Sequence, residues 1–193
     1  MTDTSNDAGT DTNHHAVSDT GETGGMPQDA PFALRTPDLT LVALAPSAAL
    51  DLASGGTGGF TWIEGGPEEG TRVGAGVMAK AAAEGAHRPG WGTYVLVRES
   101  DGLAVGAMGF HGPPSGGRVE IGYDVVAAAR RNGYATQALR ALTAWALESV
   151  GAVVARTEPT NRGSRRTLER VGFTRVPSPD AAWVAYELSA CVG

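Results

Sequence analysis

The segment with the clearest chemical character is Arg-Arg-Asn-Gly-Tyr-Ala at positions 130–135, between a predicted strand over 118–126 and a predicted helix over 135–150. Glycine and alanine allow a ligand to approach the backbone closely, and a helix start presents N–H groups that have no intrahelical partner. Arg130 and Arg131 add positive charge beside these donors. The combination predicts a phosphate-binding site. A well-capped core helix after a turn is the alternative, because the segment matches neither a Walker loop nor a dinucleotide fingerprint.

Arginine is concentrated in the same part of the chain. Nine arginines fall between positions 130 and 175, against three glutamates. This excess suits a multiply charged anionic ligand, although a solvated basic face without a ligand fits the same pattern. The formal net charge of -6 arises from the first thirty positions, so the rest of the chain is balanced. Charge therefore gives no general reason to expect a nucleic acid partner.

Composition also bears on where the protein acts. Cys191 is the only cysteine, so no disulfide forms within the chain and a reducing compartment is expected. No apolar stretch approaches the length of a membrane span, and the acidic N-terminus lacks the features of a secretory signal. A cytoplasmic location without membrane association is therefore expected. His14 and His15 have no converging partners in sequence, so no metal site is predicted.

The chain is predicted to consist of a tail and one folded domain. Residues 1–30 are polar with few large apolar side chains, which predicts a disordered acidic tail, and residues 31–193 are expected to fold. The order of the elements indicates an α/β domain with a mixed sheet. Periodicity and turn signals predict strands over 39–44, 93–98, 103–110, 118–126, 152–157, 173–176 and 182–188, and helices over 46–52, 72–86, 135–150 and 161–170.

Three stretches resemble the GNAT acetyltransferases, especially the Rim-type branch that acetylates ribosomal-protein N-termini. They are VGAMGFHGPP, VEIGYDVVAAARRNGYATQALRALTAWAL and EPTNRGSRRTLERVGF. Arg130-x-x-Gly133-x-Ala135 looks like the GNAT pyrophosphate loop, and Asn161-x-x-Ser164 looks like the start of the family's second conserved block. The resemblance implies acetyl-CoA as co-substrate. It also implies a GNAT fold, in which a mixed, mostly antiparallel sheet of about six to seven strands splays between its fourth and fifth strands and is flanked by about four helices.

The resemblance further implies roles for individual residues. Backbone groups of Val125 and Val126 would bind the pantetheine arm where the sheet splays. Asn161 would contact the pantetheine or order the site, and it is also a good helix N-cap. Ser164 would donate a proton to the departing CoA thiolate. The pyrophosphate would be bound by Arg130, Arg131, Asn132, Gly133, Tyr134, Ala135 and Thr136, and the adenosine 3′-phosphate would be reached by Arg165 or Arg166.

The reaction also needs a base, because primary amines are mostly protonated at neutral pH. Glu120 is the candidate, since the resemblance places at this position a Glu that acts through water. The alternative is a solvent-facing Glu120 paired with Arg118. His111, in the turn that follows the strand 103–110, is a second candidate base. Tyr123 either lines the pocket or packs inside.

The acceptor pocket is expected to come from segments without a recognisable pattern, namely the loop around Trp62, the helix 72–86 and the loop 178–180. We expect direct transfer of acetyl from acetyl-CoA to a primary amine, with the carbonyl polarised by backbone N–H near Val125. The acceptor is expected to be a protein or peptide N-terminus or a small amine, and the protein a monomer or homodimer. The alternatives are an aminoglycoside-type antibiotic acetyltransferase, a non-catalytic acyl-CoA-binding module and a structural interaction domain.

Overall fold

The computed structural model describes residues 32–190. The predicted disordered tail, with His14 and His15, and the single Cys191 lie outside the described residues. Within the described part, no helix is both long and apolar enough to cross a membrane. The same residues contain no group of three or more His, Cys, Asp or Glu side chains placed to hold a metal ion.

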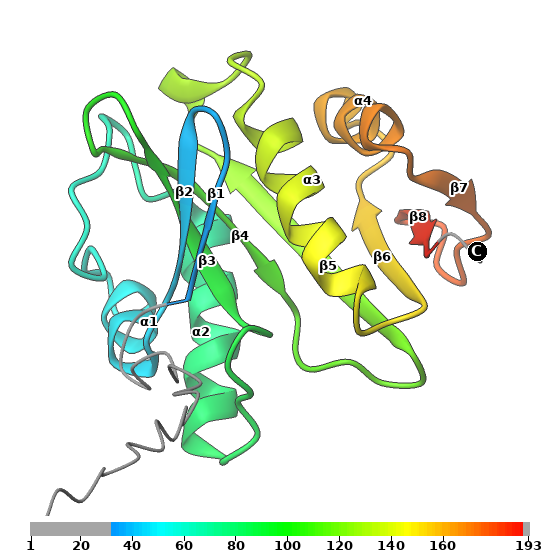
Figure 1. The fold of residues 1–193 in the computed structure, drawn as a ribbon, viewed down its shortest axis with the longest axis horizontal. Helices are drawn as coiled ribbons and strands as arrows, with labels where there is room; N and C mark the ends of the chain where they lie inside the picture. The colour runs from blue at the N-terminus through cyan, green and yellow to red at the C-terminus, as the bar shows by residue number, and fades with distance from the viewer. Residues whose placement is uncertain (1–31, 191–193) are drawn as a thin grey trace, which may run out of the picture. The chain divides into compact units, whose positions relative to one another are not determined.

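An eight-stranded sheet forms the centre of the domain, in the order β1-β2-β3-β4-β5-β6-β8-β7 (Figure 1). Among the described strands, β5 and β6 form the single parallel pair. The α/β class and the mostly antiparallel sheet are thus confirmed. The strands are β1 (Ala33–Arg35), β2 (Leu39–Ala43), β3 (Thr93–Arg98), β4 (Ala104–Phe110), β5 (Arg118–Val125), β6 (Ala152–Thr157), β7 (Thr174–Val176) and β8 (Val184–Ser189). Strand β1 was not predicted, because three residues are too few for a period-two pattern.

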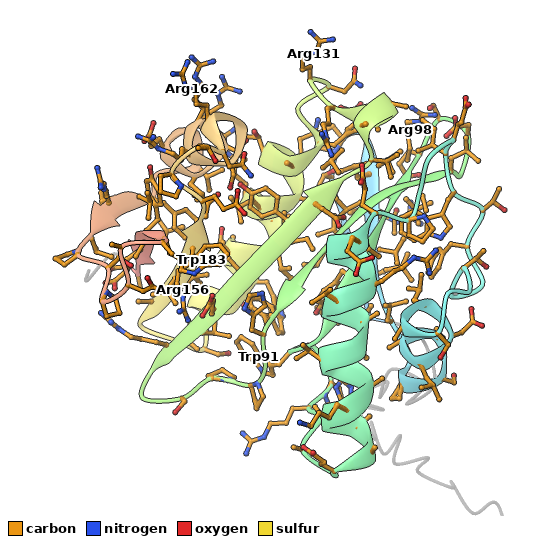
Figure 2. All side chains as sticks on the ribbon, turned by 180° about the vertical axis from the view of Figure 1, so that it is seen from behind. Trp91, Arg98, Arg131, Arg156, Arg162 and Trp183 are labelled. Atoms are coloured by element: carbon orange, nitrogen blue, oxygen red, sulfur yellow. The ribbon has the colours of Figure 1, made fainter. Side chains whose placement is uncertain are left out.

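Four helices within residues 32–190 cover the two faces of the sheet. Helix α3 lies over one face and α2 over the opposite face, as the two views show (Figures 1 and 2). The helices are α1 (Pro46–Ala53), α2 (Glu69–Ala83), α3 (Tyr134–Leu147) and α4 (Arg162–Val171), with a short 3-10 turn at Ala127–Ala129. All four predicted helices are present.

Helix α2 starts and ends three residues before its predicted bounds. Its first turn is fixed by a contact distant in sequence: Thr71 donates its backbone N–H and its hydroxyl to the Asp124 carboxylate, at 2.5 and 2.7 Å. Gly85, just beyond its C-terminus, has a φ of 69°, a conformation that favours glycine and does not continue a helix. A contact to β5 therefore sets the helix start, which the local sequence alone does not show.

Strand β5 presents different residues to the two faces, because successive side chains of a strand alternate. Val119 and Ile121 are buried in the main core with Leu139 and Leu142 of α3. Replacing either fully buried leucine by alanine would cost about 2–5 kcal/mol of unfolding free energy. The alternate positions, which include Glu120, face the side of α2. The α3 face of β5 thus stabilises the fold, and the α2 face is available for polar groups.

The sheet opens between β5 and β6. The two strands pair only from Arg118↔Ala152 to Glu120↔Val154, although β5 continues to Val125 and β6 to Thr157. Strand β6 stays paired with β8 over its whole length. The predicted splay between the fourth and fifth predicted strands is therefore present, and it begins immediately after Glu120.

Candidate active site

A groove of about 550 Å³ lies beside the open end of the splay. The end of β5, the loop that leads into α3 and one side of α4 form its walls. Four arginines line it against one carboxylate, so the groove suits an anion. Its lining residues are Tyr123, Asp124, Val125, Ala129, Arg130, Arg131, Gly133, Tyr134, Ala135, Thr136, Asn161, Gly163, Ser164, Arg166, Thr167 and Arg170.

The loop before α3 holds its backbone N–H groups free. The first bond of the helix runs from Gln137 N to Gly133 O at 3.0 Å, and no acceptor within residues 32–190 pairs with the amides of positions 131–136. Arg131 and Gly133 both have positive φ, 67° and 80°, which turns the chain sharply at the helix start. Unpaired amides at a helix N-terminus, with the helix dipole behind them, form an anion-binding site.

Arg130 anchors this loop from behind. Its Nε donates to Val125 O at 2.8 Å and its Nη2 donates to Glu68 Oε1 at 3.0 Å. The same Glu68 oxygen accepts the amide of Ala127 at 3.0 Å. The Arg130 guanidinium thus ties the loop to the end of β5 and to the start of α2. The other groove arginines therefore supply most of the positive charge available to a ligand. One of them, Arg131, points outward from the tip of the loop (Figure 2).

Asn132 and Val126 are used within the protein. The Asn132 side-chain amide donates to Ala129 O at 3.1 Å and to Arg130 O at 3.3 Å, which closes the turn, and the residue does not line the groove. The Val126 N–H donates to Val105 O, and its carbonyl accepts from Ala129. The Val126 N–H is therefore not available to the pantetheine arm, while its carbonyl keeps a second lone pair.

Val125, unlike Val126, directs its backbone N–H toward the groove. Hydrogen-bonded and non-hydrogen-bonded pairs alternate along an antiparallel ladder. Because Val126 N–H bonds to β4, the neighbouring Val125, opposite Gly106, directs its N–H and C=O away from β4. That edge of β5 faces the splay, where β6 has diverged. The Val125 amide is therefore a donor on the groove side.

The helix α4 begins at the predicted cap. Asn161 Oδ1 accepts the amide of Ser164 at 3.0 Å, so the N-cap prediction is confirmed, and both residues line the groove. Ser164 Oγ lies 3.0 Å from the hydroxyl oxygen of Tyr123. Burial raises the pKa of Tyr123, so its hydroxyl keeps its proton at neutral pH. The two hydroxyls form a hydrogen-bonded pair between β5 and α4.

Glu120 occupies the apex of the splay in an ionic cluster. Its carboxylate accepts from Arg156 of β6, with Nε at 3.1 Å, and lies 3.3 Å from Nδ1 of His111. The hydrogen bond to His111 lowers the pKa of Glu120 to about 2, with a further contribution from Arg156 and opposition from partial burial. The alternative partner Arg118 pairs with Glu187 instead, at 2.7 Å. Glu120 does not line the groove.

A second hollow, of about 440 Å³, lies on the opposite face of the sheet between α2 and strands β4 and β5. It shares Tyr123 and Asp124 with the groove, so the two spaces meet at these residues. Its walls are mainly glycine and apolar side chains. The lining residues are Gly70, Thr71, Val73, Gly74, Val77, Thr93, Ala107, Met108, Gly109, Phe110, His111, Gly122, Tyr123 and Asp124.

Asp124 was not singled out from the sequence. Besides the two bonds from Thr71, its carboxylate is 3.4 Å from the amide of Ala107, and burial raises its pKa. Gly70 leaves room for it, because a Cβ at that position would lie 2.6 Å from Asp124 Oδ2. One sequence signal could have indicated it: Glu120, Gly122 and Asp124 are alternate positions of one strand, so they share a face, whereas Val119 and Ile121 point into the core.

Trp62 lies elsewhere than expected. Its indole N–H donates to Thr57 O at 2.9 Å, and its ring packs against the cluster that joins α1 and α2 to the sheet. It lines neither the groove nor the second hollow. The loop 178–180 also lies apart: Ser178 lines a separate hollow beside Trp183. Of the segments predicted for the acceptor pocket, only α2 lines the second hollow.

The model of the family described as acetyltransferase (GNAT) domain matches residues 61–174, which is more than half of the chain. The chain belongs to the GNAT family. The Bacillus subtilis (strain 168) protein "Uncharacterized N-acetyltransferase YjdG" is 39% identical over 87 residues, 44% of this chain and 52% of that protein. The match thus spans about half the length of this relative.

Solved GNAT structures share the fold. The acetyltransferase from Agrobacterium tumefaciens strain C58 is 26% identical, with a TM-score of 0.57 and coverage of 82% of this chain and 95% of that one. Mycobacterium smegmatis RimJ, solved in complex with CoA-disulfide, is 19% identical, with a TM-score of 0.54 and coverage of 83% and 87%. The predicted GNAT family and fold are therefore confirmed.

Proposed function

We propose that this GNAT domain transfers an acetyl group from acetyl-CoA to a primary amine, by direct attack in a ternary complex. One observation carries the proposal: no acceptor within residues 32–190 pairs with the backbone amides of positions 131–136, and five of these six residues line a groove beside a splayed sheet. Family membership and the B. subtilis relative's name support the same activity.

The donor set of the groove fits the chemistry of a coenzyme A molecule. The amides of 131–136 would hold the pyrophosphate, and Arg131, Arg166 and Arg170 would supply countercharge. The Val125 N–H would bind the pantetheine arm and, near the acetyl end, polarise the thioester carbonyl. The loop is open at Gly133, because a Cβ at that position would meet nothing within 4 Å.

The residues around the splay divide the proton transfers between them. Ser164, hydrogen-bonded to Tyr123, would donate a proton to the departing thiolate. The cluster around Glu120 lies on the other side of β5, toward the second hollow, and would receive the proton of the amine. An acid on one side of the splay and a base on the other suit an attack that passes through the opening.

The second hollow favours an acceptor of low charge. Its lining contains one carboxylate, Asp124, among glycines, threonines and apolar side chains. Glu68, an acidic residue at the start of α2, binds Arg130 and the amide of Ala127, so it is not available to attract a polycationic acceptor. We therefore propose a peptide or protein N-terminus, or a small amine, over an aminoglycoside. The resemblance to the Rim-type branch supports the same acceptor class.

A thiol-release assay with acetyl-CoA tests the proposal. The acceptor panel would contain short peptides with N-terminal Ser or Ala, free amino acids and aminoglycosides, and calorimetry would measure acetyl-CoA affinity. We expect binding together with amine-dependent release of CoA, strongest with the peptides. Binding without thiol release from any amine would instead establish the non-catalytic acyl-CoA-binding module. Absence of binding would favour the structural interaction domain.

A further inference from the structure

His111 projects from the end of β4 into a region that the groove does not reach. It is adjacent to Phe110, and its backbone N–H donates to Glu120 O at 3.0 Å. Its side chain is 53% exposed and lines the second hollow. The residue thus lies on the face of the sheet where the amine acceptor is proposed to bind.

The two ring nitrogens of His111 have different environments. Nδ1 lies 3.3 Å from Glu120 Oε1, while Nε2 has no hydrogen-bond partner within residues 32–190. Nε2 lies over Gly122, where an added Cβ would approach it to 2.6 Å. A carboxylate at Nδ1 favours the tautomer with the proton on that nitrogen, which leaves a lone pair on Nε2.

Glu120 is itself fixed by a third group. Arg156 binds it from β6, on the far side of the splay, with its Nε at 3.1 Å. Both carboxylate oxygens therefore have partners: Oε1 contacts Arg156 Nε and His111, and Oε2 contacts Arg156 Nη2. Such a carboxylate orients its neighbour and has little capacity to take a proton.

We propose that Nε2 of His111 is the atom that accepts the proton of the acceptor amine, and that Glu120, held by Arg156, positions the imidazole. The proposal rests on the function proposed above and assigns one of its steps to an atom. The acceptor is mostly an ammonium at neutral pH: one of its N–H bonds breaks, the proton passes to Nε2, and the lone pair left on the nitrogen bonds to the acetyl carbon. The nitrogen then loses its remaining extra proton to solvent. The C–S bond breaks, and the thiolate takes a proton from the Tyr123–Ser164 pair. His111 then returns its proton to solvent, from which the hydroxyl pair is restored.

The charges around His111 are consistent with this division of roles. Glu120 on β5 and Arg156 on β6 form the ionic cluster, and Asp124 on β5 lines the same hollow. Helix α2 contributes to the hollow only Gly70, Thr71, Val73, Gly74 and Val77, and β3 contributes Thr93, so neither adds a titratable group. The imidazole and guanidinium beside Glu120 lower its pKa to about 2, so this carboxylate has little capacity to take a proton.

The test compares His111→Gln and Glu120→Gln with wild type, and His87→Gln serves as the control because His87 lines neither the groove nor the second hollow. The substrates are acetyl-CoA and a peptide with N-terminal Ser or Ala, and kcat/KM is measured from pH 6 to pH 9. Calorimetry with acetyl-CoA shows whether each variant is folded and retains its groove.

For His111→Gln we expect kcat/KM to fall about 100-fold at pH 7. This loss should shrink to less than about 10-fold at pH 9, because α-amines, whose pKa is about 8, are then mostly neutral without a base. Glu120→Gln should lose less than His111→Gln at pH 7, and His87→Gln should match wild type. All variants should bind acetyl-CoA within about twofold of wild type.

Three outcomes would overturn the assignment: His111→Gln retaining wild-type kcat/KM at pH 7, a loss that is the same at every pH, or a larger loss for Glu120→Gln than for His111→Gln. The second would indicate a structural role for His111, and the third would make Glu120 the base. Failure of the wild-type protein to release thiol with any amine would contradict the proposed function, and the His111 assignment with it.

Discussion

The groove and the second hollow meet at Tyr123 and Asp124, yet different kinds of chemical group line them. The groove presents backbone amides from one continuous loop, together with arginines of the loop and of α4. The second hollow is lined by residues of four separate elements, α2, β3, β4 and β5, together with His111. A site made from backbone depends on the conformation of a few consecutive residues, and local sequence shows it. A site made from side chains depends on how distant elements pack.

The largest effect is expected from a negative charge in the backbone-built site. Ala135 lines the groove within the first turn of α3, so Ala135→Asp would place a carboxylate against the proposed pyrophosphate. We expect acetyl-CoA affinity to fall at least about 100-fold through like-charge repulsion. Calorimetry would measure the change. The control, Ala83→Asp at the exposed end of α2, should bind as wild type does, and equal losses in both variants would refute the location of the site.

The next largest effect is expected on turnover alone, which would separate the second hollow from acetyl-CoA binding in the groove. Gly122→Ala would displace the His111 imidazole, because the new Cβ would come within 2.6 Å of Nε2. We expect kcat/KM at pH 7 to fall about 10-fold while acetyl-CoA affinity stays within about twofold. Gly76→Ala is a matched control, since its Cβ would make only an ordinary 3.7 Å contact with Ala53. Unchanged turnover in Gly122→Ala would mean that the His111 position is immaterial.

The elements themselves were largely predictable, because each has a local signal. The helix α3 has apolar residues at spacings of three and four, and α4 (Arg162–Val171) has Asn161 as its N-cap, as predicted. The side-chain contact between β5 and β6 at the splay had no such local signal. Glu120 and Arg156 are 36 positions apart and meet because β5 and β6 are parallel neighbours with a particular register. The expectation of an Arg118 partner used sequence proximity, which a strand does not preserve in space.

In the site, too, local features were predictable and tertiary contacts were not. The loop 130–135 was predictable from its residue types, but the use of Arg130 to bind Glu68 and Val125 was not, because Glu68 is 62 positions away. The sequence also did not show that the Val126 N–H is bonded to β4, since the pairing of β5 with β4 decides which residue directs its N–H to the opening. Packing of Trp62 onto α1 and α2 likewise follows from tertiary contacts.

A smaller effect is expected from a single groove arginine. Arg166 lines the groove from α4, and Arg166→Ala should weaken acetyl-CoA binding about 3–10-fold at low ionic strength, through loss of one contact with a phosphate. The difference from wild type should shrink as salt is added, because exposed charges are screened. Arg88→Ala, in an exposed turn outside the groove, is the control. A loss that does not depend on salt would argue against a charge–charge contact.

The smallest effect tests the side-chain-built hollow. Gly74 and Gly76 lie in the same helix, but only Gly74 lines the hollow, and alanine at either position makes ordinary contacts of 3.7 Å. Both substitutions should raise the free energy of unfolding by about 0.5–1 kcal/mol in urea titrations, since alanine favours a helix. Gly74→Ala alone should raise the acceptor KM, by about twofold to fivefold. Equal KM values for the two variants would contradict an acceptor bound in this hollow.

The amides of positions 131–136 can be observed directly by ¹H–¹⁵N NMR during titration with coenzyme A, and in parallel with pantetheine, which lacks the pyrophosphate. If these amides bind the diphosphate, their resonances shift with coenzyme A and stay in place with pantetheine, which moves only signals near Val125. Saturation with coenzyme A that leaves all six resonances unmoved would contradict the proposed pyrophosphate site at the start of α3.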